Sequence, residues 1–214
     1  MAGSVDSTGS PWRLVVTPVG LMVVALAVMW GVEVIDSVAL NDELQRNGLR
    51  PRHREGLDGI LWGPFLHSDF GHIASNSVPF LGLGGLVAVR GRRYWAWVTS
   101  AAIILGGGLT WVLAGDGNHV GASGVVFGYF GAILGAAVFE RHVRALGAAL
   151  IALGFYSSLI AGLVPQDAIS WEGHLFGLIA GLIVARVLAE PQSKPFDEPH
   201  EPEPWELDEP WKLT

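Results

Sequence analysis

Two side chains that could carry out acyl transfer lie inside apolar stretches of this sequence. Ser123 lies within a Gly-Ala-Ser-Gly run near the start of one stretch, and His174 follows Gly173 near the start of another. Hydrocarbon solvates polar groups poorly, so such residues inside a membrane segment indicate a functional site. A serine hydroxyl becomes an effective nucleophile when a neighbouring imidazole takes its proton. The pair therefore predicts hydrolysis carried out within a bilayer.

The composition is that of a membrane protein. Of the 214 residues, 50% are hydrophobic and 15% are charged, against about 25% charged in typical soluble domains. Six stretches approach the roughly 20 apolar residues that cross a bilayer as a helix. The sequence therefore predicts an all-α fold, a polytopic bundle of six transmembrane helices. The predicted spans are residues 14–32, 72–89, 95–114, 120–139, 143–164 and 172–189.

Three regions follow along the chain: an N-terminal segment 1–13, a membrane domain 14–190 and a tail 191–214. From Glu190 onward there are eight acidic residues and two lysines, which give −6 of the net charge of −7. The tail also holds six of the twelve prolines, a composition that predicts disorder. The membrane domain has no basic stripe, so nucleic acid is not an expected partner. Cysteine is absent, which excludes disulfides and thiolate metal sites.

The distribution of arginines orients the predicted helices. The positive-inside rule places both termini and the arginine-bearing turns in the cytoplasm of a cell that holds the protein in its plasma or inner membrane. The turns 116–119 and 165–171 and the long segment 33–71 then face outward. The arginines that set this orientation are Arg13, Arg90, Arg92, Arg93, Arg141, Arg144 and Arg186.

Ser123 and His174 are expected at one depth, near the outer surface. They lie about three and two residues into parallel helices that rise 1.5 Å per residue. Gly173, Gly177 and Gly181 recur every four residues, the small-residue pattern of closely packed membrane helices. The other helix is also rich in glycine, beginning with Gly124. The sequence therefore predicts that the two helices approach closely enough for a serine–histidine hydrogen bond.

A second pair of polar residues opens the predicted span 72–89. His72 and Asn76 are four residues apart and so share one helix face. With the backbone N–H of Ser123 they could hold a developing oxyanion. The alternative is an interhelical hydrogen bond that only stabilises packing. His67, just before this span, is expected to organise the outer segment.

Other residues near the site compete for these roles. His119, four residues before Ser123, is a rival base. A metal site built from His67, His72 and His174 is conceivable, but no HExxH motif supports it, and we predict neither metal nor cofactor. The nearby acidic residues are expected to be solvated loop charges rather than a third catalytic group: Asp116, Asp167 and Glu172.

In combination these motifs resemble the rhomboid family of intramembrane serine proteases. His67, His72 and Asn76 form an HxxxxHxxxN pattern, followed by the Gly-Ala-Ser-Gly run at 121–124 and the Gly-His pair at 173–174. Each motif alone is weak, but the three occur in order. The resemblance extends over all six predicted spans.

The resemblance implies a catalytic dyad in which Ser123 is the nucleophile and His174 the general base. It also implies an oxyanion site formed by His72, Asn76 and the Ser123 N–H, with Phe127 stacked on the imidazole. Supporting positions are Gly121, Gly124 and Gly177. The expected substrates are single-span membrane proteins, cut near their outer ends. The glycines of the fifth span and Pro165 indicate loose packing there, so we expect lateral entry past this span, with the loop 165–171 as a lid.

One feature departs from the family pattern. Rhomboids often carry a Trp-Arg pair in the first outer loop, and segment 33–71 has none. Arg50, Arg52 and Arg54 are candidates to hold the loop instead. Two other classes fit the sequence less well. An inactive rhomboid-like chaperone would lack the serine or the histidine, and a transporter would need polar residues deeper in the third to fifth spans.

Overall fold

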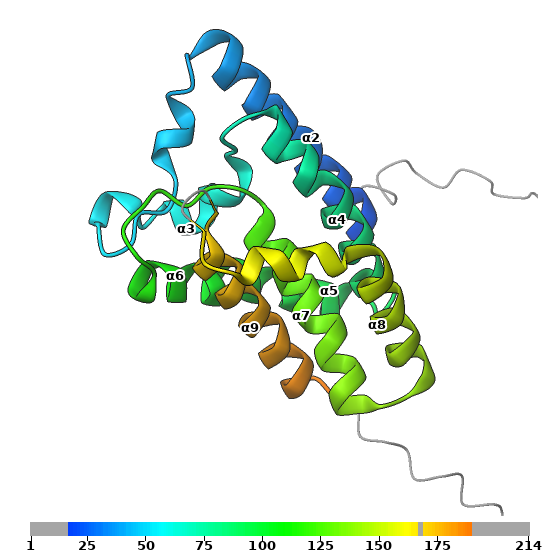
Figure 1. Ribbon diagram of the computed structural model, residues 1–214. Helices are drawn as coiled ribbons and strands as arrows, with labels where there is room; N and C mark the ends of the chain where they lie inside the picture. The colour runs from blue at the N-terminus through cyan, green and yellow to red at the C-terminus, as the bar shows by residue number, and fades with distance from the viewer. Residues whose placement is uncertain (1–16, 167–168, 190–214) are drawn as a thin grey trace, which may run out of the picture.

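Residues 17–166 and 169–189, which the computed structural model describes, form an all-helical fold (Figure 1). The predicted all-α class is confirmed. The predicted segments 1–13 and 191–214 lie outside the described residues. In chain order the helices and helical turns are α2 (Pro18–Ala39), η1 (Leu44–Asn47), η2 (Arg54–Gly56), α3 (Gly59–Trp62), η3 (Gly63–Phe65), α4 (Phe70–Ala88), α5 (Arg92–Ala101), the π-helical η4 (Ala102–Gly106), α6 (Gly107–Leu113), α7 (Ser123–Glu140), α8 (Val143–Tyr156), η5 (Ser157–Leu163) and α9 (Trp171–Val187).

Within the described residues, four helical segments are long and apolar enough to cross a membrane. They are α2, the continuous α5–η4–α6 segment, α7, and α8 with η5. The other two predicted spans correspond to α4, of 19 residues, and α9, of 17 residues. Polar residues in the first half of α4 lower its hydropathy, and α9 is short, so their crossing of the membrane stays a prediction.

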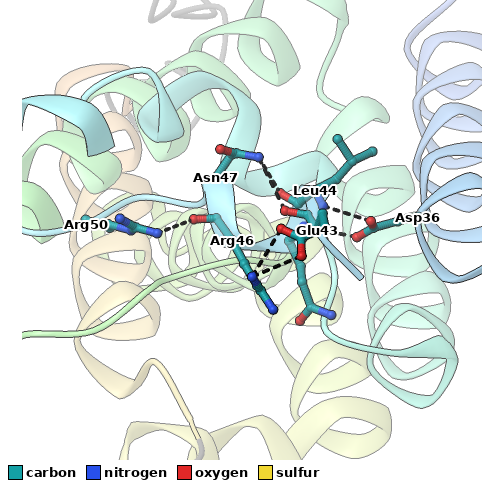
Figure 2. A network of polar contacts seen from close by, with 7 residues as sticks. Asp36, Glu43, Leu44, Arg46, Asn47 and Arg50 are labelled. Carbon is teal, nitrogen blue, oxygen red and sulfur yellow. Dashed lines mark hydrogen bonds and ion pairs between the residues drawn. The ribbon is translucent and has the colours of Figure 1, made fainter. Parts of the chain in front are cut away.

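Helix α2 ends later than the sequence predicts. The predicted first span stops at residue 32 because Glu33 and Asp36 follow, yet the helix continues to Ala39. Both acidic residues are buried, and the Asp36 carboxylate accepts hydrogen bonds from the backbone N–H groups of Leu44 (2.8 Å) and Gln45 (3.0 Å). Because buried carboxylates are tolerated when they are hydrogen-bonded, the charge does not end the helix here. It fixes the turn that follows, as Figure 2 shows.

Helices α7 and α9 form the centre of the bundle, where they run side by side (Figure 1). In the most apolar stretch of α7, 67% of the residues are buried, against 11% in the corresponding stretch of α8 with η5. Glycines allow the close approach: a side chain at Gly177 would collide with the carbonyl of Gly124, and one at Gly181 with the carbonyl of Gly128. The predicted small-residue contact is therefore present, and it involves backbone atoms of both helices.

Residues 40–69, between α2 and α4, are called the outer segment here after their predicted side of the membrane. They are tied to the loop that precedes α7. Leu49 and His119 exchange backbone hydrogen bonds of 2.8 and 3.0 Å, and the Asn118 side chain donates to the Gln45 carbonyl (2.7 Å). These bonds place the outer segment directly over the N-terminus of α7.

Arg52 holds the same segment to the end of α6. Its guanidinium donates to the carbonyl of Ala114 and to the carboxylate of Asp116, each at 2.5 Å. Arg50 instead reaches the carbonyl of Arg46 within its own segment (2.8 Å), as Figure 2 shows. Of the three arginines that were candidates to hold this segment in the absence of a Trp-Arg pair, Arg52 is therefore the one that connects it to the end of α6.

A largely buried ion pair joins the turn after α4 to the last residue of α7, at the end of the bundle far from Ser123. Arg90 donates to both oxygens of Glu140, at 2.8 and 2.5 Å, and the Glu140 side chain is fully buried. His142 Nε2 lies 3.0 Å from the same carboxylate. Such two-point pairing is directional, so it fixes the register of α4 against α7.

We expect Gly181→Ala to destabilise the fold because the new methyl group would press on the Gly128 carbonyl and the Ala132 amide. Overpacking typically costs about 1–3 kcal/mol. Thermal unfolding in detergent measures the effect. Gly154→Ala is the matched control, since a methyl group at this α8 position meets only open space, and alanine favours helix by about 1 kcal/mol over glycine. Equal melting temperatures for the two variants would contradict the proposed packing.

Candidate active site

The turn before α7 requires glycine at position 121. Gly121 has φ +108°, a conformation that L side chains rarely adopt. Its N–H donates to the carbonyl of Gly63 (2.9 Å), which anchors the turn to η3. A methyl group here would meet the His72 ring at 2.7 Å and the Asn76 amide nitrogen at 3.5 Å. Gly121 thus gives the turn its shape and keeps space open beside these two side chains.

His67 anchors the next residue of the turn. Its ring is 2% exposed, and its Nε2 accepts the backbone N–H of Ala122 at 3.4 Å. Burial, with His72 nearby, lowers the pKa of His67 to about 4. The ring is therefore neutral near pH 7 and keeps a lone pair for Ala122. The prediction that His67 organises the outer segment agrees with this contact.

The Ser123 hydroxyl meets His174 across the α7–α9 contact. Ser123 Oγ lies 2.8 Å from His174 Nε2, and His174 Nδ1 lies 2.8 Å from the carbonyl oxygen of Gly162. Because a carbonyl can only accept, Nδ1 carries the ring proton and Nε2 presents its lone pair to the serine. This arrangement orients the histidine to act as a proton acceptor.

Two neighbours fix the plane of the imidazole. Phe127, one turn after Ser123, stacks on the His174 ring with centroids 4.3 Å apart and planes 11° from parallel. Gly162 lies so close that a methyl group there would meet the His174 ring at 3.0 Å and Phe127 at 3.1 Å. The stacking was expected from the resemblance. The role of Gly162 was not, because a backbone carbonyl leaves no side-chain signal in a sequence.

His72 and Asn76 line the same cavity as Ser123 and His174. The Ser68 hydroxyl lies 3.1 Å from His72 Nδ1, and the Asn76 amide donates to the carbonyl of His72 (3.1 Å). An amide nitrogen has two hydrogens, so Asn76 keeps a second donor. Ser123 is the first residue of α7, and a helix offers no acceptor for its first N–H groups.

These side chains share one cavity of about 750 Å³. Its wall includes the side chains of Ser123, His174, His72 and Asn76, together with residues of η5. The lining is partly polar, and the volume suffices for both water and a segment of polypeptide. A serine, a base and several hydrogen-bond donors therefore face the same space.

The competing residues are engaged elsewhere. His119 Nδ1 lies 2.5 Å from the hydroxyl of Ser170 and makes no hydrogen bond to Ser123. Asp116 pairs with Arg52. Glu172 accepts the backbone N–H of Gly115 (3.2 Å), so it joins two segments rather than standing free in solvent. Asp167 lies outside the described residues.

The fold and the site define a class: a helical, multi-pass membrane protein with a serine–histidine pair inside its bundle. The rhomboid domain model matches residues 57–191. This range contains every residue of the candidate site. The chain belongs to the rhomboid family.

The chain is also similar to individual bacterial proteins, of which one carries a rhomboid name. The uncharacterized protein Rv1337 of Mycobacterium tuberculosis is 34% identical over 179 residues, covering 79% of this chain and 74% of the relative. The uncharacterized protein ML1171 of Mycobacterium leprae is 32% identical over 179 residues, covering 79% and 70%. YdcA of Bacillus subtilis, a provisionally named rhomboid protease, is 29% identical over 122 residues, covering 56% and 61%.

We expect His67 to make stability fall on acidification. Its folded-state pKa is about 4, against about 6.5 when unfolded. The unfolded chain therefore binds the extra proton first, and stability falls as the pH drops from 6.5 to 4, by up to about 3 kcal/mol. His67→Gln keeps an acceptor but does not titrate. Between pH 7.5 and pH 5 in detergent, the melting temperature should fall further for the native protein than for His67→Gln. Equal falls in melting temperature would contradict a buried neutral His67 ring.

Proposed function

We propose that this protein is an intramembrane serine endopeptidase. The observation that carries the proposal is the bond between Ser123 Oγ and His174 Nε2, with the other ring nitrogen held by a carbonyl. A nucleophile within hydrogen-bond reach of an oriented base is the signature of covalent catalysis. Membership of the rhomboid family supports the same reaction class.

In the proposed mechanism His174 Nε2 takes the proton of Ser123 as the hydroxyl oxygen attacks a substrate carbonyl. A tetrahedral oxyanion forms, and collapse expels the amine, which receives that proton from His174. Water, activated by the same imidazole, then hydrolyses the acyl-enzyme and regenerates Ser123. The Gly162 carbonyl accepts the Nδ1–H throughout, and so favours the imidazolium that forms in each step.

The oxyanion is assigned to three hydrogen-bond donors whose residues line the same cavity. These are the Ser123 N–H at the start of α7, the free hydrogen of the Asn76 amide, and the Nε2–H of His72. Ser68 supports this tautomer of His72 because its backbone N–H (3.5 Å) can donate to Nδ1. Removal of one such donor typically costs 10²–10³ in rate, or about 3–4 kcal/mol.

The proposed substrates are single-span membrane proteins whose scissile bond lies near the outer face. The arginine distribution supports cytoplasmic termini in a plasma or inner membrane, and hence a dyad near the outer leaflet. A helical substrate must unwind to expose its carbonyls, which glycine and other weak helix formers favour. The segment made of α8 and η5 is the least buried of the four apolar segments in the described part of the chain, which supports lateral access on that side.

The test is covalent labelling of the purified full chain in detergent with a fluorophosphonate, followed by cleavage of a single-span substrate with a glycine-rich outer end. We expect native protein to be labelled at Ser123. Ser123→Ala and His174→Ala should lower cleavage by about 10⁴-fold or more while unchanged thermal unfolding shows that they fold. Ser100→Ala, an exposed serine of α5, is the control.

Asn76→Ala separates the oxyanion role from a packing role. It should still be labelled at Ser123, with cleavage slowed about 10²- to 10³-fold. Native protein that binds the substrate without labelling or cleavage would overturn the protease assignment in favour of an inactive rhomboid-like binding protein.

A further inference from the structure

A second serine–histidine contact joins the same two segments that carry the dyad. His119 Nδ1 lies 2.5 Å from Ser170 Oγ, and Ser123 Oγ lies 2.8 Å from His174 Nε2. His119 comes four residues before Ser123, and Ser170 comes four residues before His174. The two contacts thus connect equivalent positions of the two segments, with the residue types exchanged.

Ser170 stands in the position where serine usually caps its own helix. It is the N-cap residue of α9, yet its side chain makes no capping hydrogen bond. A serine cap normally accepts an N–H of the first turn and contributes about 1 kcal/mol. Here the hydroxyl is directed to His119 instead. Loss of this hydroxyl therefore removes a contact between segments and leaves the capping of α9 unchanged.

The backbone of Ser170 is connected directly to the dyad. The Ser170 carbonyl accepts the backbone N–H of His174 at 3.1 Å, which is the helical hydrogen bond between residues four apart. A displacement of Ser170 along the outer surface therefore moves His174 with it. Gly173 leaves room for the Ser170 hydroxyl, since a methyl group there would lie 2.5 Å from this oxygen.

His119 is itself held firmly from the other side. Its backbone N–H and carbonyl both pair with Leu49 of the outer segment. The ring is half-buried, and burial lowers its pKa. His119 and Ser170 both line a small cavity that Ser123 also lines and a second cavity of about 350 Å³. Ser170 lines the active-site cavity as well, so the contact lies where these cavities adjoin.

We propose that the His119–Ser170 hydrogen bond is a positioning contact that sets the separation of Ser123 and His174. The inference rests on the proposed protease function. His119 is fixed to the outer segment and Ser170 to His174, so their bond transmits the position of the outer segment to the dyad. Ser170 lies one helical turn before His174, so a small shift of Ser170 moves the base relative to the nucleophile. A misplacement of reacting groups by about 1 Å can lower the rate about 10²-fold.

The test measures the rate constant for phosphonylation of Ser123 together with kcat and KM for a single-span substrate, in the full chain in detergent. Ser170→Ala and His119→Leu should each lower the phosphonylation rate and kcat by about 10- to 100-fold, with KM and the melting temperature nearly unchanged. The double variant should be no slower than the slower single variant, because both changes remove one bond.

Conservative variants distinguish positioning from general damage. Ser170→Thr keeps the hydroxyl, and His119→Asn keeps a polar group near the Nδ1 position, so both should stay within about threefold of the native rate if a single hydrogen bond sets the geometry. Ser100→Ala is the matched serine control. If Ser170→Thr and His119→Asn were as slow as Ser170→Ala and His119→Leu, the result would contradict a role for this bond.

Two further outcomes are decisive. Native rates in Ser170→Ala and His119→Leu would overturn the inference while leaving the proposed function standing. Phosphonylation found by mass spectrometry on Ser170 instead of Ser123 would also overturn it, because Ser170 would then be a nucleophile. Native protein that does not react at Ser123 would instead overturn the proposed function.

Discussion

The close approach of α7 and α9 is the constraint on which the rest of the structure depends. The helices touch through backbone: a side chain at Gly177 would strike the Gly124 carbonyl, and one at Gly181 the Gly128 carbonyl. In a bilayer, helices associate through such packing because lipid offers no hydrophobic driving force between them. Ser123 and His174 lie at the same end of this contact, and their 2.8 Å hydrogen bond requires both helices to keep this spacing.

The outer segment completes the site by fixing the turn that delivers Ser123. Gly63, His67 and Leu49 contact consecutive parts of that turn, and Arg52 and Asp36 hold the segment itself. On the other side, η5 provides the Gly162 carbonyl that orients His174. Displacement of η5 would therefore remove the acceptor that orients the imidazole.

The motifs with a strict chemical or packing requirement could be predicted from sequence. Ser123, His174, the glycines of α9 and the Phe127 stack all depend on residue type and helical spacing, and the structure brings these residues together. The extension of α2 to Ala39 could not be predicted, because the partners of Asp36 are backbone N–H groups of the following turn, which leave no side-chain signal. The contact of the Gly162 carbonyl with His174 and the His119–Ser170 bond could not be predicted either, because both depend on how separate segments of the chain pack together.

The most direct test of the central claim is the rate of Ser123 phosphonylation as side-chain volume grows at position 177. Gly177→Ala and Gly177→Val would push α9 progressively away from the Gly124 carbonyl, with melting temperatures measured to select folded protein. We predict a stepwise fall in rate from glycine to alanine to valine, with no fall for the same changes at Gly154. A native rate in folded Gly177→Val would contradict the claim that this helix contact sets the dyad.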